Sequence, residues 1–175
     1  NQSVYRQIML RHVKHPFPAV TSQNARILIL GSVPSVKSVE NNFYYMHPQN
    51  RFWRVLSRIF DEDFTAMQTQ EKIAALHRHG IALYDSVEEC DIQSSKDSAI
   101  SNVIPADIEK IMSGTEIERI FCNGKASFNY LVKYHPDLAE IAEVLPSTSP
   151  ANAAYSLDRL VTEWCKILEY TNKQF

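Results

Sequence analysis

The chain has 175 residues, of which 45% are hydrophobic, and this suits one globular domain (1–175) with a buried core. Eighteen lysines and arginines stand against twenty aspartates and glutamates, a formal net charge of -2. A protein that binds nucleic acid through its overall charge is clearly basic, so any such contact here must lie in a local cleft. No apolar run is long enough to cross a membrane, and we expect no membrane partner.

The cysteines, Cys90, Cys122 and Cys165, are odd in number and far apart. This spacing predicts neither a disulfide framework nor a zinc or iron–sulfur site, so we expect no metal and no cofactor. Buried, reduced thiols are typical of a cytoplasmic protein. No heptad pattern or long apolar edge favours assembly, and we expect a monomer.

Short apolar runs alternate with helical patterns along the chain. Residues 1–24 resemble a leading arm, and strands are predicted at 26–30, 80–84, 117–122 and 141–145. Helices are predicted at 51–60, 70–79, 105–112, 125–134 and 156–168. This alternation indicates the α/β class, with a mostly parallel four-stranded sheet covered by helices on both faces. Ligands of such folds bind beyond the carboxyl ends of the strands, which selects the loops 31–50, 85–102 and 146–154.

The first of these loops combines a tight turn with aromatic and polar side chains. GSVPS at 31–35 predicts a turn that leaves backbone N–H groups free at the strand end. YYMHPQNRFW at 44–53 then brings aromatic rings beside His47 and Asn50. A ring to stack on and an amide to pair with are what a pocket for a nucleobase needs.

These two motifs, followed by LPSTSPANA at 145–153, resemble the uracil-DNA glycosylase superfamily over roughly residues 14–170. The resemblance is strongest to its hypoxanthine-DNA glycosylase branch. The chain also resembles the mismatch-specific uracil enzymes more than it resembles the large uracil-DNA enzymes. It implies a three-layer α/β/α sandwich that flips a deaminated base out of damaged DNA and hydrolyses its glycosidic bond. Because no lysine nucleophile is required, an abasic site without strand cleavage is the expected product.

The chain departs from the superfamily at Val33. Most members carry an Asp or Asn there, two residues after the first glycine, to activate water, whereas Val33 has no lone pair and the preceding Ser32 is a poor base. The resemblance assigns the catalytic amide of the hypoxanthine branch to Asn50, which would orient water or bind the base. Hypoxanthine is therefore favoured over uracil.

The resemblance also assigns substrate contacts to Tyr45, as the ring that stacks on the base, and to Asp85. A carboxylate at position 85 would accept the N1–H of hypoxanthine, a donor that adenine lacks. Further substrate contacts are predicted for Ser32, Val33, His47 and Ser149. Contacts with DNA, as phosphate ligands, cations or a wedge, are predicted for Lys37, Arg51, Lys125, Ser147, Thr148, Pro150 and Asn152.

Structural roles compete with several of these assignments. Asp85 could instead cap a helix with Glu88 as its capping-box partner, and His47 could brace the turn before Pro48. Phe52 and Trp53 are better explained as core residues. Lys125 could be a solvated charge.

Three other functions are alternatives to this one. A mismatch-specific uracil enzyme would cut U:G duplexes faster than I:T duplexes, and an inactive lesion-binding protein would bind inosine DNA without product. A nucleotide-binding domain is disfavoured because the chain has only four glycines and no phosphate loop.

Overall fold

The centre of the molecule is a parallel four-stranded sheet. The computed structural model describes residues 10–93 and 100–171. The strands β2 (Ile27–Gly31), β3 (Ile81–Asp85), β6 (Arg119–Asn123) and β7 (Ala142–Leu145) lie in the order β3-β2-β6-β7. All neighbouring pairs are parallel, so the predicted sheet is confirmed. The inner strand β2 is apolar and fully buried, as expected for a strand covered on both faces.

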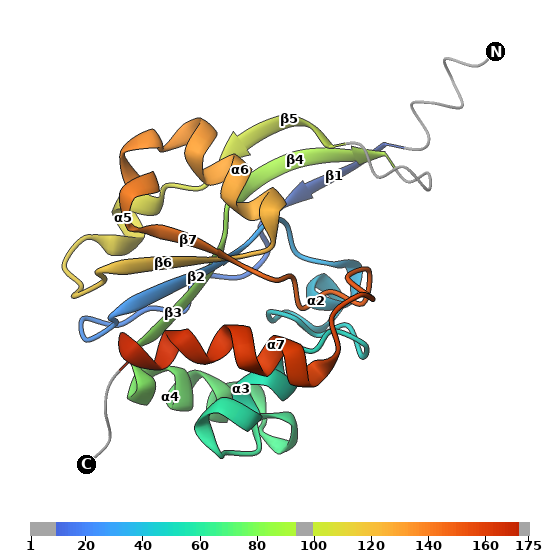
Figure 1. Ribbon diagram of the computed structural model, residues 1–175. Coiled ribbons are helices and arrows are strands. Elements are labelled where there is room, and N and C mark those ends of the chain that lie inside the picture. The colour runs from blue at the N-terminus through green and yellow to red at the C-terminus, as the bar shows by residue number, and fades with distance from the viewer. Residues whose placement is uncertain (1–9, 94–99, 172–175) are drawn as a thin grey trace.

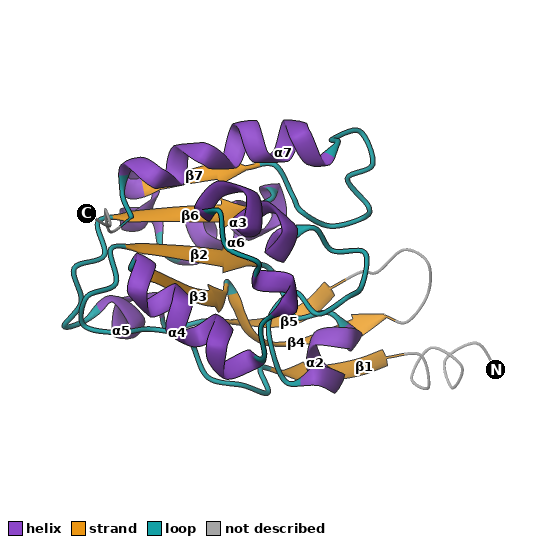
Figure 2. Ribbon diagram, turned by 90° about the horizontal axis from the view of Figure 1, so that it is seen from below, coloured by secondary structure: helices purple, strands orange, loops and turns teal. Residues whose placement is uncertain are grey.

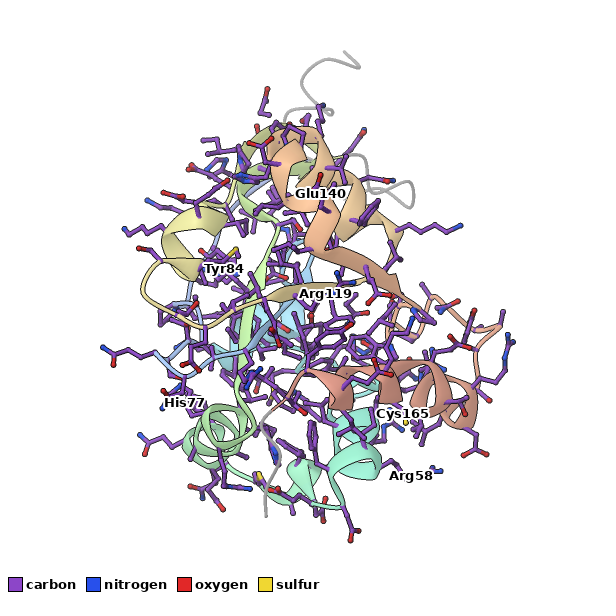
Figure 3. All side chains as sticks on the ribbon, turned by 60° about the vertical axis from the view of Figure 1, so that its left-hand side comes forward. Arg58, His77, Tyr84, Arg119, Glu140 and Cys165 are labelled. Carbon is purple, nitrogen blue, oxygen red and sulfur yellow. The ribbon has the colours of Figure 1, made fainter. Side chains whose placement is uncertain are left out.

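Helices cover the two faces of this sheet (Figures 1 and 2). One layer holds α3 (Phe52–Phe60), α4 (Thr69–His79) and α7 (Leu157–Trp164), and the other holds α5 (Ile108–Met112) and α6 (Lys125–Tyr134). Short 3-10 helices are η1 (Phe64–Ala66), η2 (Pro136–Ile141) and η3 (Cys165–Glu169). Figure 3 shows the layers through labelled side chains, with Arg58 and Cys165 on one side of Arg119 and Glu140 on the other. The predicted three-layer sandwich is therefore present.

The helices follow from the sequence pattern. Phe52, Trp53, Val55 and Leu56 form the buried stripe of α3, which confirms that Phe52 and Trp53 are core residues. Helix α7 begins after Ser156, whose hydroxyl accepts the N–H of Arg159. In the part of the chain that the structure describes, no helix has the length and hydropathy needed to span a membrane.

A second, antiparallel sheet was not predicted. It consists of β1 (Leu10–Lys14), β4 (Val87–Gln93) and β5 (Ile100–Pro105) in the order β1-β4-β5. The segment expected to be a loop at 85–102 is therefore largely strand, apart from residues 94–99, which lie outside the described residues. Helix α2 (Val36–Asn41) also interrupts the predicted loop 31–50.

The prediction of a leading arm is wrong for its described part. β1 pairs with β4 along its whole length, Leu10 opposite Gln93 and Lys14 opposite Glu89. Val20 then forms a bridge with Leu83, and Phe17 and Val20 are buried in the core. Residues 1–9 of the expected arm lie outside the described residues. The N-terminal segment is thus an integral part of the domain.

Candidate active site

The carboxyl ends of the parallel strands border a cavity of about 190 Å³. Residues of the selected loops 31–50 and 146–154 meet there with Asp85, the first residue of the third selected segment, as the rule for parallel sheets requires. Predicted site residues among its lining are Ser32, Val33, Tyr45, Asn50, Asp85, Ser147, Thr148 and Ser149. Pockets for drug-sized molecules enclose about 300–1,000 Å³, so this cavity suits a ligand the size of a single base.

One side of the cavity, which we call the amide wall, consists of Asn50, Asn123 and Thr148. The Asn50 side-chain oxygen accepts the backbone N–H of Phe52 at 2.9 Å and the Thr148 hydroxyl at 2.8 Å. Asn123 donates its amide to the same hydroxyl at 2.9 Å and accepts the Thr148 backbone N–H at 2.9 Å. Because a backbone N–H can only donate, the atom of Asn50 that faces it must be oxygen. The NH2 group of Asn50 makes no hydrogen bond within the described residues and is the group left for a ligand.

The opposite side, the carboxylate wall, consists of Gly31 and Asp85, and His15 supports Asp85 from outside the cavity lining. The Asp85 side chain is about 5% exposed, and its Oδ2 lies 2.7 Å from Nε2 of His15, whose side chain is fully buried. Nδ1 of His15 donates to the carbonyl oxygen of Phe17 at 2.8 Å. A Cβ added to Gly31 would lie under 3.0 Å from Asp85 Oδ1, so only glycine allows this carboxylate to cross the end of β2.

Asp85 is not a helix cap. It is the last residue of β3, and the chain continues directly into β4. The alternative with Glu88 as its capping partner is therefore wrong: the Tyr84 hydroxyl donates to the Glu88 carboxylate instead.

Tyr45 lies between the two walls. Its ring stacks on Phe52 with centroids 4.0 Å apart, and its backbone has a φ of +57°, which is uncommon for an aromatic residue. Its hydroxyl is buried and makes no well-formed hydrogen bond among the described residues, although the side chain of Asn123 is near enough to act on it. Burial, reinforced by the negative charge of Asp85, raises the pKa of this hydroxyl, which therefore stays protonated as a potential donor.

The turn at 31–35 supplies backbone groups, as expected. Within the described residues, the N–H groups of Ser32 and Val33 make no hydrogen bond, whereas the carbonyl oxygen of Ser32 accepts from Val87. The side chain at the position where the superfamily places its acid or amide is the apolar Val33, and it borders the cavity.

The assignment of Thr148 to a DNA phosphate is wrong. Its side chain is fully buried and its hydroxyl is used by Asn50 and Asn123. Arg51 also has an internal role, since its guanidinium donates to the carbonyl oxygens of Tyr155, Ser149 and Asn152. These bonds hold the loop that carries Thr148 against α3, and an additional contact between Arg51 and DNA stays a prediction.

His47 is not among the residues that line the cavity. Its Nδ1 accepts the N–H of Gln49 at 3.1 Å, which is the bracing role, and the ring is not part of the lining. The structure thus gives His47 the bracing role, and a contact with the substrate stays a prediction.

The remaining predicted DNA contacts lie at the surface. Lys125 borders a wider depression of about 830 Å³ with Ser147, Ser149 and Asn152. Ser147 and Ser149 border both this depression and the cavity, so the two lie next to each other. Lys37 is exposed and pairs with Glu40 at 3.2 Å, and Pro150 is exposed at the tip of its loop. Their contacts with DNA stay predictions.

Three site residues were missed in the sequence. Asn123 ends β6 as Asp85 ends β3, so the rule that selected Asp85 could have selected it too. His15 and Phe17 were assigned to an arm, and no local pattern connects them to a loop 70 residues later. Among the described residues, no three His, Cys, Asp or Glu side chains gather as metal ligands would.

Comparison with known proteins agrees with this geometry. The sequence profile of the "Uracil DNA glycosylase superfamily" matches residues 18–170. A protein named hypoxanthine DNA glycosylase from Methanosarcina acetivorans is 33% identical over 156 residues, 87% of this chain and 96% of its own. One of the same name from Methanosarcina barkeri is 34% identical over 144 residues, 79% of this chain and 88% of its own.

A solved structure is also similar. It is a solution NMR structure from Methanosarcina acetivorans, described as a candidate uracil DNA glycosylase, with a TM-score of 0.77 and 31% identity. The match covers 90% of this chain and 97% of the other. The chain therefore belongs to the uracil DNA glycosylase superfamily and is a DNA glycosylase.

Proposed function

We propose that this enzyme removes hypoxanthine from DNA by hydrolysing the glycosidic bond of a nucleotide flipped out of the duplex, leaving an abasic site. The observation that carries the proposal is the pairing of the two walls, one offering the NH2 group of Asn50 and the other Oδ1 of Asp85. Hypoxanthine carries an N1–H that a carboxylate accepts, together with oxygen and nitrogen acceptors for an amide. Adenine has no N1–H and would face Asp85 with a lone pair.

Asn50 is the proposed catalytic residue. When the bond between C1′ and the base breaks, negative charge develops on the departing base. The NH2 group of Asn50 and the free N–H groups of Ser32 and Val33 supply donors that stabilise this charge. The Asn50 oxygen already accepts two hydrogen bonds, which favours a role on the base over a role in activating water. Water would then capture a sugar that already carries positive charge, with little need for a base at Val33.

The depression beside the cavity is the proposed path of the DNA strand. Ser147, Ser149 and Asn152 offer hydroxyl and amide groups there, and Lys125 offers a positive charge. Such groups fix the register of a nucleic-acid backbone without reading its sequence. The exposed Pro150 is the residue proposed to enter the base stack. The relatives named hypoxanthine DNA glycosylase support the proposed lesion.

A second candidate is uracil, because its N3–H would also satisfy Asp85 and because the similar solved structure is described as a candidate uracil enzyme. The test is alkali-revealed cleavage of end-labelled duplexes that carry either inosine or uracil. We expect product from inosine, and loss of about 100-fold or more in Asn50→Ala, as when a donor to a developing negative charge is removed. Asn129→Ala, on the exposed face of α6, is the matched control. Product from uracil alone would replace the proposed lesion, and tight inosine binding without product would indicate a lesion-binding protein.

A further inference from the structure

His15 lies outside the motifs that identify the family, yet it is bonded to the residue proposed to read the base. We infer that His15 is a positioning residue that keeps Asp85 Oδ1 a pure hydrogen-bond acceptor and thereby sets the preference for a base with an N–H on its pairing edge. The inference rests on the proposed function and adds a residue to its specificity mechanism.

The hydrogen-bond partners of His15 restrict where protons can be. Nδ1 faces the carbonyl oxygen of Phe17 at 2.8 Å, and because a carbonyl can only accept, this nitrogen carries a proton. Nε2 faces Asp85 Oδ2 at 2.7 Å, and one proton must lie between those two atoms. Whether that proton is bound to nitrogen or to oxygen, it lies in the hydrogen bond to Oδ2. Oδ1 is left without a proton in both cases.

The surroundings of His15 prevent a different arrangement. The imidazole is fully buried, stacks on Tyr84 with centroids 4.2 Å apart and meets the ring of Phe17 edge-on at 4.8 Å. On the other side, Asp85 Oδ1 lies over Gly31, where a Cβ would not fit. These contacts restrain both the ring and the carboxylate. Asp85 borders the cavity together with Gly31, and Oδ1 is the oxygen that lies beside Gly31 and is not bonded to His15.

An unassisted buried carboxyl group would behave differently. In an apolar site, a carboxyl group tends to bind a proton and can then donate as well as accept. A donor at this place would pair with the N1 lone pair of adenine as readily as an acceptor pairs with the N1–H of hypoxanthine. By holding the proton on the far oxygen, His15 would exclude normal adenine, the most frequent wrong substrate with a similar shape. Guanine shares the N1–H, so this device does not exclude it.

The experiment compares single-turnover excision from duplexes that carry deoxyinosine or deoxynebularine, whose unsubstituted purine has no N–H on the pairing edge. His15→Phe keeps the ring that packs on Tyr84 but loses both hydrogen bonds. We expect the ratio of inosine to nebularine excision to fall about 10- to 100-fold, the usual loss for a hydrogen bond to a charged group. His15→Gln, which can still donate to Oδ2, should retain most of the ratio and covers the case in which the Phe variant does not fold.

Two controls separate positioning from packing. In an Asp85→Ala background, His15→Phe should lower the ratio no further, because His15 acts only through Asp85. His79→Phe removes an equally buried histidine that stacks on Phe60 at 4.0 Å and bonds to Glu62 at 2.6 Å, and it should leave the ratio unchanged.

The outcomes are distinguishable. If wild type releases no hypoxanthine, the proposed function fails and this inference falls with it. If wild type releases hypoxanthine but folded His15→Phe keeps the wild-type ratio, the inference alone is overturned. A further drop of the ratio in the double variant would also overturn it, since His15 would then act independently of Asp85.

Discussion

The two walls of the cavity achieve the same kind of control by different means. On the amide wall, a neutral side chain is oriented by two donors to its oxygen, so that Asn50 presents N–H groups. On the carboxylate wall, an acidic side chain is oriented by a histidine and a missing Cβ, so that Asp85 presents an oxygen. The amide wall comes from loops at the ends of parallel strands, whereas the carboxylate wall also recruits the N-terminal segment. Buried neighbours, rather than the reactive residues alone, determine whether each wall donates or accepts.

Replacing the glycine of the carboxylate wall should have the largest effect on excision. In Gly31→Ala, the new Cβ displaces Oδ1 of Asp85, which cannot move without breaking its bond to His15. A misplacement of about 1 Å can cost about 100-fold in rate, and we expect that loss in single-turnover excision of hypoxanthine. Gly114→Ala is the control: no atom lies within 4 Å of its Cβ, but its φ of +74° is unfavourable, so it should lower stability and leave excision intact. Wild-type excision by Gly31→Ala would disprove the proposed geometry.

A substitution at Thr148 in the amide wall should have a smaller effect, because Thr148 acts on the base only through Asn50. Thr148→Val keeps the shape of the side chain but removes the hydroxyl that fixes Asn50, and it leaves Asn123 without its acceptor. We expect a loss of about 1–3 kcal/mol in the free energy of unfolding. Excision should fall roughly tenfold, which corresponds to about 1.4 kcal/mol. Thr162→Val, on the exposed side of α7, should change neither quantity; if both valine variants behave alike, the orienting role of Thr148 is refuted.

Asp85→Asn should lower excision by a smaller factor, and it tests whether the carboxylate wall contributes an acceptor or a negative charge. A neutral His15 that keeps the proton on Nδ1 can accept from the new amide NH2, which would turn the amide oxygen toward the cavity. We therefore expect only a several-fold loss of excision, against about 100-fold for Asp85→Ala, in the same single-turnover assay. Equal losses in the two variants would show that the negative charge, and not the acceptor, is what Asp85 contributes.

The smallest expected effect concerns a histidine that belongs to neither wall. Burial lowers the pKa of His79, against the opposing influence of Glu62. Because the folded state binds a proton on His79 less readily than the unfolded state does, its contribution is present above pH about 6.5 and is lost as the pH falls below that value. Between pH 7.5 and 5.5, the Tm of wild type should therefore fall slightly more than that of His79→Phe. Parallel Tm curves would contradict the assignment.

Much of the fold was predictable because its periodicity is simple. Strands such as β2 are continuous apolar runs, and α3 has one apolar stripe, so both follow directly from local pattern. The antiparallel sheet was not predictable in this way. Strand β4 carries Glu88, Glu89 and Asp91 and is only partly buried, so its polar composition resembles a loop.

The site residues likewise divide into those that a local sequence pattern indicates and those that it does not. Asn50, Tyr45 and Asp85 stand in or directly after recognisable motifs and strands, and the structure brings them to one cavity. The role of Thr148 was misjudged because a hydroxyl beside two serines suggests a phosphate ligand, and only the fold shows that it is buried. His15 carries no local signal, because its function depends on a partner 70 positions away.

That separation also bears on how the enzyme acquires its activity. The bond between His15 and Asp85 closes a loop of 70 positions, and the bond between Asn50 and Thr148 closes one of 98. Neither can be made early, since distant pairings form only after the entropy of loop closure has been overcome. During refolding, helical signal should therefore return before the capacity to excise a base. An incompletely folded chain would lack both the donor and the acceptor, and would leave the damaged base in the DNA.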